Sequence, residues 1–168
     1  MFEGLNEAVV AEIEKKYLPE MVEHNDETKD EWKWLQTEEA FTLKQKIAHE
    51  NEIQLSEIVW INRGGKDYRT YPYGAQRQVL TYVVNSIWAD GGFESREEVL
   101  NLFFQGHFNG KLLKIARCVE KSFGKGSFRM LAGMSKESNS AWQMLEQLKK
   151  KRRLLAKHSL STENRTGI

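Results

Sequence analysis

Apolar residues recur three and four positions apart in three consecutive segments of residues 111–158, and this periodicity restricts that part of the chain to amphipathic helices. The first helix is expected at 111–123 and is followed by a glycine, a common helix stop. A short second helix at 127–132 is followed by another glycine, and a longer third helix runs to residue 158. The predicted N-terminal caps are Ser127 for the second helix and Ser138 or Asn139 for the third.

A block of five cations lies in the third helix. They are Lys149, Lys150, Lys151, Arg152 and Arg153. The helix dipole favours cations near a helix C-terminus, so a solvated helix end is the alternative interpretation, but it explains two or three cations rather than five. Two short helices before a longer basic helix is the order of a helix-turn-helix, in which the last helix enters the major groove of DNA. The block is therefore predicted to bind phosphates.

Residues near the start of the third helix are the predicted contacts with base edges, because helix-turn-helix units use that part of the helix to read bases. The candidates are Lys136, Ser138, Asn139, Ser140 and Gln143. Arg129 and Asn139 stand where such units usually have a small and an apolar residue. Residues 111–158 therefore agree with a helix-turn-helix in the order of the helices, but they do not carry the sequence signature of a helix-turn-helix family.

Charge is divided unevenly along the chain, although the 168 residues carry a net charge of only +1. Residues 1–60 contain 6 Lys and Arg and 15 Asp and Glu, whereas residues 61–168 contain 19 and 9. This separation predicts either an acidic region that packs against a basic one or two surfaces for different partners.

The acidic character is strongest in residues 20–39, which hold 8 acidic residues, 2 lysines and the aromatic residues Trp32 and Trp34. One interpretation is a solvated loop and helix face. The other is a protein-binding surface anchored by the two tryptophans, because aromatic residues contribute much of the binding energy at many interfaces. The second interpretation predicts a protein-binding adaptor or inhibitor.

Residues 58–71 predict a small β-hairpin, because four strand-favouring residues precede a Gly-Gly turn and an alternating segment. Cations alternate with aromatic residues here. The cations are Arg63, Lys66 and Arg69. Exposed rings beside cations suit single-stranded nucleic acids, since bases stack on the rings while the cations follow the phosphates. The alternative is that the rings cover the core.

The remaining apolar patterns predict four more helices. They cover residues 5–17, 37–51, 76–90 and 96–105. Pro19 is expected to end the first, and Ser95 with Glu98 forms a capping box before the last. The helices at 76–90 and 96–105 are the most apolar and should be the most buried. The sequence thus predicts a mainly α, multi-helix globular domain of seven or eight helices, with a C-terminal helix-turn-helix-like tri-helical unit and one small hairpin near 58–71.

Four regions follow from these patterns. They are an acidic N-terminal helical region at 1–60, a central helical core with the hairpin at 61–110, the basic tri-helical unit at 111–158 and a flexible tail at 159–168.

No arrangement of residues in the sequence is typical of a catalytic site. The four histidines are dispersed without metal-ligand spacing. The glycines and lysine of 122–127 lack the strand and the Gly-Lys-Ser/Thr end of a phosphate-binding loop, and are read as a turn between helices. His107, in a predicted glycine-flanked loop, is the titratable residue to inspect for a site. A nuclease site could otherwise be assembled from Asp67, Asp90 and Glu94, although their spacing does not favour it. We expect no catalytic residues, cofactor or metal.

The single cysteine and the hydropathy of the sequence indicate the cellular compartment in which the protein is expected. Cys118, expected as a small buried residue of the helix at 111–123, permits no disulfide within the chain. Neither an apolar run of membrane-spanning length nor a leader pattern is present. The cytoplasm is the expected location, or a host cell's cytoplasm if a virus encodes the protein.

Three functions are therefore ranked. The first is a non-enzymatic nucleic-acid-binding protein, with DNA favoured over RNA and a role in transcription. The second is a protein-binding adaptor or inhibitor that uses residues 20–39. The third is an enzyme acting on nucleic acid. No membrane partner is expected, and the oligomeric state stays open.

Overall fold

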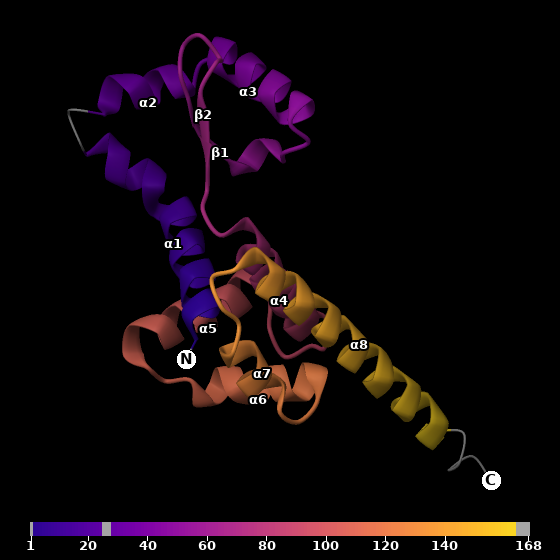
Figure 1. Cartoon of the computed structure of the whole chain (residues 1–168). Helices are drawn as coiled ribbons and strands as arrows, with labels where there is room; N and C mark the ends of the chain where they lie inside the picture. Colours follow the sequence, from indigo (N-terminus) through magenta and orange to yellow (C-terminus); the bar gives the residue numbers. More distant parts are fainter. Residues whose placement is uncertain (1, 25–27, 164–168) are drawn as a thin grey trace. The chain divides into compact units, whose positions relative to one another are not determined.

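The computed structural model describes residues 2–24 and 28–163, with side chains described as far as residue 158. Within these residues the chain forms eight α-helices, one short 3-10 helix and one two-stranded antiparallel sheet (Figure 1). The predicted mainly α fold with a single small hairpin is confirmed. None of the helices in the described part combines the length and apolar character needed to cross a membrane.

The chain forms two compact units. Unit 1 comprises Met1–Glu12 and Tyr73–Ile168, and unit 2 comprises Ile13–Pro72. The first turns of the N-terminal helix belong to unit 1, with the C-terminal part of the chain. That helix, α1 (Glu3–Glu23), begins in unit 1 and ends in unit 2.

Unit 1 is built around α4, the helix that buries most of its length. Its helices are α4 (Gly74–Ala89), α5 (Arg96–Asn109), α6 (Leu113–Phe123), α7 (Ser127–Ala132) and α8 (Ser138–Glu163). Helix α4 packs against α5, α6 and α8 (Figure 1). Val79, Leu80 and Val83 of α4 are fully buried with Val119 and Phe123 of α6, and burial of each such side chain contributes about 1.5–3 kcal/mol.

Helices α4 and α8 lie side by side and run in the same direction. At one end, the Gln76 amide donates hydrogen bonds to the carbonyl oxygens of Ser135 (3.3 Å) and Lys136 (2.6 Å). At the other end, Asp90 accepts two hydrogen bonds from Arg152 of α8. The contact between the two helices is therefore fixed at both ends by polar side chains.

The beginning of α1 is part of unit 1. The Phe2 N–H donates to the carbonyl of Ala132 (2.7 Å), and the Gly4 N–H donates to that of Met134 (2.9 Å). Arg77, almost fully buried in α4, donates to Glu12 at 2.7 Å. These contacts attach the N-terminus to the segment that precedes α8.

Two helix ends differ from the prediction. Pro19 does not stop α1, which continues to Glu23; the proline removes one backbone hydrogen bond, and only about one more turn of helix follows it. Helix α5 continues through Gly106 to Asn109, so His107 lies in a helix and not in a loop. The absence of a Cβ at Gly106 lets the Cδ1 atom of Ile115 on α6 approach the helix closely, and a larger residue there would require the end of the Ile115 side chain to shift.

Two predictions concern the ends of the tri-helical unit. Neither Ser138 nor Asn139 precedes α8, because Ser138 is already its first residue, and the Ser140 hydroxyl accepts a hydrogen bond from the Ser135 N–H at 3.1 Å. Helix α8 continues to Glu163, into the segment predicted as a tail. Residues 164–168 of that segment lie outside the described residues.

Unit 2 combines two helices with the hairpin. Its elements are α2 (Lys29–Leu35), α3 (Glu38–Glu50), the 3-10 helix Leu55–Glu57, β1 (Ile58–Ile61) and β2 (Tyr68–Thr70). Ile58 pairs with Thr70 and Ile61 with Tyr68, with an irregularity between them. A small core forms between α2, α3 and β1. It consists of Leu35, Ala40, Ile47, Ala48, Ile58 and Ile61.

Candidate nucleic-acid interface

The exposed side of α6 carries a row of cations. Lys114, Arg117 and Lys121 are three and four residues apart and therefore project from one side of the helix, opposite the buried Ile115 and Val119. Within the described residues, none of the three cations forms an ion pair. These three charges are therefore not compensated by a carboxylate of the described residues, and the Lys114 ammonium lies 5.6 Å from the centre of the Phe93 ring.

Cys118 lies between these cations and is half-buried, not fully buried as predicted. Burial raises the pKa of its thiol, although the charges of Lys114 and Lys121 oppose the shift. The thiol is therefore a neutral neighbour of the row of cations.

Three further cations extend the row at both ends of α6. Lys111 precedes the helix, while Lys125 and Arg129 follow it, and all three are exposed. No ion pair joins them to a carboxylate in the part of the chain that the structure describes. We define the basic surface as Lys111, Lys114, Arg117, Lys121, Lys125 and Arg129.

Glu120, the carboxylate of α6, caps the next helix. Its Oε2 accepts a hydrogen bond from the Gly126 N–H at 2.6 Å, and its Oε1 accepts one from the Phe128 N–H at 3.0 Å. Ser127, the predicted cap, instead donates its hydroxyl hydrogen bond to the Phe123 carbonyl at 2.9 Å. The start of α7 is thus occupied by a carboxylate from the same unit and is not an anion-binding site.

The basic block of α8 lies next to the α6–α7 turn, because the Lys151 ammonium donates to the Lys125 carbonyl at 3.3 Å. Two other members of the block have anionic partners in the same chain. Lys149 pairs with Glu146 at 2.8 Å, and Arg152 pairs with Asp90. Lys150 and Arg153 are exposed and without an ion pair within the described residues. The block predicted to bind phosphates therefore has two cations fully available.

Asp90 is a structural carboxylate. Burial alone would raise its pKa, but hydrogen bonds from Arg152 and Ser122, together with the charges of Arg152 and Lys121, outweigh burial and lower the pKa of Asp90. The carboxylate is therefore charged at neutral pH and engaged by Arg152.

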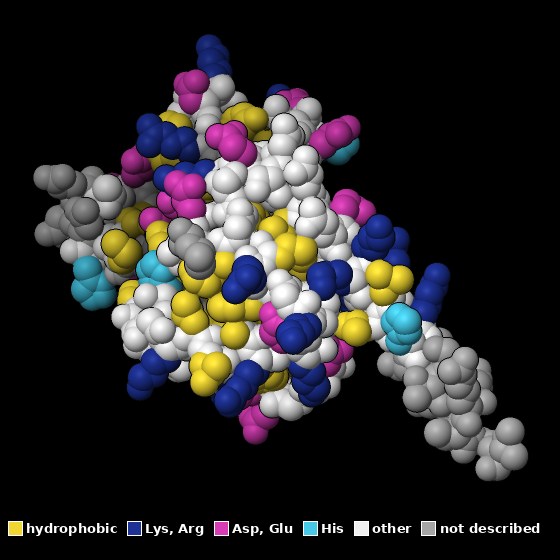
Figure 2. Space-filling view, turned by 60° about the horizontal axis from the view of Figure 1, so that its bottom comes forward, with side chains coloured by type: hydrophobic (Ala, Val, Ile, Leu, Met, Phe, Trp, Pro, Cys, Tyr) yellow, Lys and Arg dark blue, Asp and Glu magenta, His cyan; other side chains and the backbone are white. Residues whose placement is uncertain are grey.

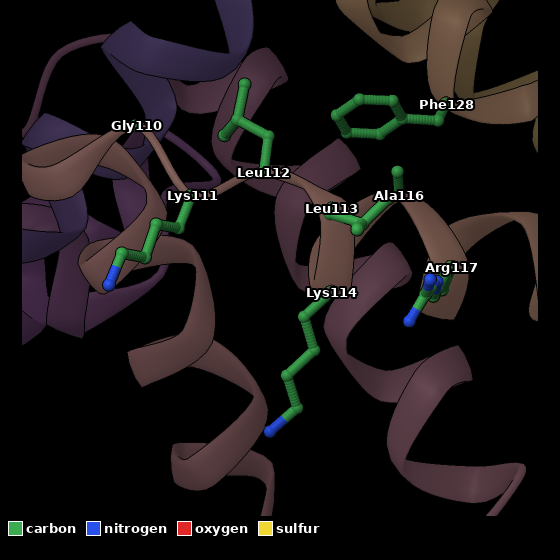
Figure 3. Close-up of a pocket in the computed structure, with 8 residues that line it drawn as sticks. All are labelled: Gly110, Lys111, Leu112, Leu113, Lys114, Ala116, Arg117 and Phe128. Atoms are coloured by element: carbon green, nitrogen blue, oxygen red, sulfur yellow. The ribbon is translucent and has the colours of Figure 1, made fainter.

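An apolar groove runs beside the basic surface. This open groove of about 830 Å³ is lined by Gly110, Lys111, Leu112, Leu113, Lys114, Ala116, Arg117 and Phe128. In Figure 3 the ring of Phe128 faces the side chains of Leu112 and Ala116, whereas Lys111 and Lys114 extend away from the ring. The groove thus has an apolar floor and a cationic rim.

The same combination is visible on the side of unit 1 formed by α5, α6 and α7. Figure 2, turned toward this side, shows Lys and Arg side chains scattered around apolar patches, with few acidic side chains between them.

The predicted base-reading residues divide into two groups. Asn139 and Gln143 are exposed, and their helical spacing places them on the same side of α8 as Lys150. Ser138 and Ser140 belong to the first turn of α8, where Ser138 is exposed. The structure thus offers the beginning of α8 to solvent.

Lys136 stands apart from this group, because it pairs with Glu3 (3.2 Å) and Glu7 (3.6 Å) of α1. The hydrogen bond to Glu3, followed by the charges of Glu3 and Glu7, raises its pKa. Its positive charge is therefore locally compensated.

The three cations predicted on the hairpin belong to unit 2. The guanidinium of Arg63 lies 5.7 Å from the centre of the Trp34 ring, and that of Arg69 lies 5.4 Å from the Trp60 ring. Lys66 is exposed in the turn. Both arginines therefore already contact aromatic rings of their own unit.

Trp32 and Trp34 are half-buried against the core of unit 2. Part of each ring therefore contributes to folding of this unit, and only the remainder is open to a partner.

His107 lines a second, apolar cavity of about 180 Å³ within unit 1, together with side chains that include Leu5, Phe103 and Ile115. Its Nδ1 atom is buried without a hydrogen-bond partner in the described residues.

No group of three or more His, Cys, Asp or Glu side chains able to hold a metal occurs in the described ranges. Two of the three candidate carboxylates have local partners, since Asp67 accepts from Asn62 at 2.8 Å and Asp90 binds Arg152. The third, Glu94, is exposed.

The basic surface and Phe128 are candidate functional residues that the sequence pattern did not predict. Their signal was present in the polar positions of residues 111–123, where cations recur at helical spacing opposite the apolar stripe. No family model, curated protein or solved structure matches the chain, so the geometry of this surface alone supports an interpretation.

Proposed function

We propose that the protein is a non-enzymatic nucleic-acid-binding protein whose basic surface binds the phosphate backbone. The observation that carries the proposal is the row of six exposed cations without ion pairs in the described residues, extended by Lys150 and Arg153 of α8. A polyanion gives such a row a partner for every charge.

Counterion release explains why this row would bind. Each cation that neutralises a phosphate releases condensed counterions, which adds about 0.9 to the slope of log affinity against log salt on duplex DNA and about 0.7 on a single strand. Six contacts would give a slope of about −4 to −5. Binding should therefore be strong at low salt and weaken steeply as salt is added.

The order of α6, α7 and α8 also supports this class of function. It is the order of a helix-turn-helix, and the exposed row of Asn139, Gln143 and Lys150 supplies hydrogen-bonding groups beside a cation. Regulation of transcription is the biological role that we propose on this basis.

The test compares two triple variants that remove the same charge. One replaces Lys114, Arg117 and Lys121 by serine, and the control replaces Lys29, Lys33 and Lys46 of unit 2. Fluorescence anisotropy is measured with a labelled random duplex and a labelled single strand at low and moderate salt. The first variant should bind at least tenfold more weakly, with the magnitude of the salt slope reduced by about 2–3, and the control should bind nearly as wild type. Equal losses in both variants, or no binding of wild type at low salt, would contradict the proposal.

The alternative proposal is a protein-binding adaptor or inhibitor that uses the acidic segment 20–39, with Trp32 and Trp34, and the adjoining helix α3. Phe41 of α3 is 49% exposed and follows the exposed Glu38 and Glu39, which gives this helix an apolar residue in acidic surroundings. A partner recovered by pull-down with wild type, but not with Phe41→Ser, would support it.

A further inference from the structure

We infer that the groove beside the basic surface binds a single-stranded nucleic acid, whose unpaired bases stack on Phe128 and the neighbouring leucines. This inference rests on the proposed function and specifies the form of the ligand. It changes the expectation drawn from the order of the helices, which favoured duplex DNA.

The apolar floor of the groove favours unpaired bases. Leu113 is 65% exposed, and Leu112, Ala116 and Phe128 are half-exposed. A duplex keeps the faces of its bases stacked inside and presents phosphates and base edges, so it offers little to an apolar floor. An unpaired base exposes an apolar face that stacks on an aromatic ring regardless of sequence.

The cations of the rim are placed for the backbone of the same strand. Lys111, Lys114 and Arg117 belong to the segment that forms the floor, and Figure 3 shows Lys111 and Lys114 directed away from Phe128. A strand lying along this segment could therefore place its bases toward Phe128 and its phosphates toward the rim. A groove with a cationic rim and an aromatic platform is the arrangement that single-strand binding uses.

Phe128 is held in position before any ligand arrives. Its N–H donates to Glu120 at 3.0 Å, and its ring packs against the ring of Phe2 with centroids 5.3 Å apart. A ring fixed in this way loses little conformational freedom when a base stacks on it, which favours binding.

The experiment separates stacking from charge with an abasic strand. The probes are a labelled 12-residue thymidine strand, an abasic strand with the same number of phosphates, and a 12-base-pair duplex, each titrated with the full chain at low salt. Wild type should bind the thymidine strand about tenfold more tightly than the abasic strand, since stacking of one base contributes about that factor. It should also prefer the thymidine strand to the duplex. A uridine strand of equal length then tells RNA from DNA.

Two variants locate the stacking site. Phe128→Leu should weaken binding of the thymidine strand about tenfold and leave binding of the abasic strand unchanged. Because Phe128 is half-buried, Leu113→Ser serves as a second variant at an exposed position and should act in the same direction, with a smaller loss. Phe41→Leu, in unit 2, is the matched control and should bind like wild type. Circular dichroism confirms that each variant is folded.

The outcomes distinguish the two proposals. Equal affinity for the abasic and thymidine strands, or tighter binding of the duplex, would overturn the single-strand inference while leaving the proposed function intact. Absence of binding to all three probes at low salt, or full affinity in a Lys114→Ser, Arg117→Ser variant, would overturn the proposed function itself.

Discussion

The guanidinium of Arg152 donates two hydrogen bonds to the carboxylate of Asp90, at 2.7 and 3.0 Å. Asp90 is the C-cap residue directly after α4, and Arg152 lies within α8, so the bidentate pair joins the end of one helix to the other. The side chains are 30% and 27% exposed, which limits screening by solvent. Arg152 thus stabilises the fold, although it belongs to the block of five cations that the sequence predicts to bind phosphates.

Replacement of Arg152 by alanine should lower the free energy of unfolding by about 1–2 kcal/mol, because a partly buried bidentate pair is stronger than an exposed one. Urea denaturation measures this loss. A double-mutant cycle with Asp90→Ala should give a coupling energy near 1 kcal/mol. The control Arg153→Ala, one residue away and exposed, should change stability by less than about 0.5 kcal/mol. Additive single effects would show that the pair contributes no coupling.

The lowered pKa of Asp90 predicts a pH dependence of stability. A carboxyl group whose pKa is lower in the folded state stabilises the protein above the pKa of the unfolded chain, about 4, and this contribution is lost as the pH falls through the folded pKa. The difference in unfolding free energy between wild type and Asp90→Asn should therefore be largest near neutral pH and shrink below about pH 4. Urea denaturation at pH 7, 5 and 3 measures it, and a difference independent of pH would contradict this account.

Glu120→Ala should destabilise unit 1 by about 1–2 kcal/mol, because two backbone N–H groups at the start of α7 lose their acceptor. Thermal denaturation measures the loss. Gln147→Ala, at an exposed position of α8, is the control and should have little effect. A Glu120→Ala variant as stable as wild type would show that solvent replaces the cap without cost.

Gly4→Ala should destabilise unit 1 by about 1–3 kcal/mol, because a Cβ there would overlap the carbonyl oxygens of Ser135 and Met134, and backbone atoms cannot move aside cheaply. Gly74→Ala is the matched control, since a Cβ on Gly74 meets no atom within 4 Å. The control should be neutral or slightly stabilising. Equal effects of the two changes would show that α1 does not pack on the segment before α8 in solution.

Local signals in the sequence predicted most helix boundaries. The Thr37 hydroxyl accepts from the Ala40 N–H at 3.3 Å, and the Ser95 hydroxyl accepts from the Glu98 N–H at 3.1 Å, as expected for N-terminal caps. Such caps involve residues three positions apart, so the sequence displays them directly. Gly106 is different, because its role depends on contact with Ile115 of another helix. The neighbouring residues in the sequence do not distinguish a glycine that permits two helices to pack closely from a glycine that ends a helix.

The sequence predicted the residues of the candidate site less well than the helix boundaries, for a related reason. The block at 149–153 was prominent because its cations are consecutive, yet contacts with Glu146, Lys125 and Asp90 engage three of its members. The cations of α6 are separated by apolar residues and became one surface only through helical geometry. The Lys149–Glu146 pair spans three residues of one helix and is visible in the sequence. The contacts of Lys151 and Arg152 join segments far apart in the chain, so the sequence does not show that these two cations are engaged.

Lys136 and Lys121 provide the sharpest comparison of predicted and observed availability. Both are exposed, and each replacement by serine removes one positive charge. Lys136 pairs with Glu3 and Glu7, whereas Lys121 has no ion pair within the described residues. Lys121→Ser should therefore weaken nucleic-acid binding severalfold and reduce the magnitude of the salt slope by about 0.7–0.9, whereas Lys136→Ser should change affinity less than about twofold. Anisotropy titrations over a series of salt concentrations measure both quantities. A larger loss from Lys136→Ser than from Lys121→Ser would contradict this ranking of the two lysines.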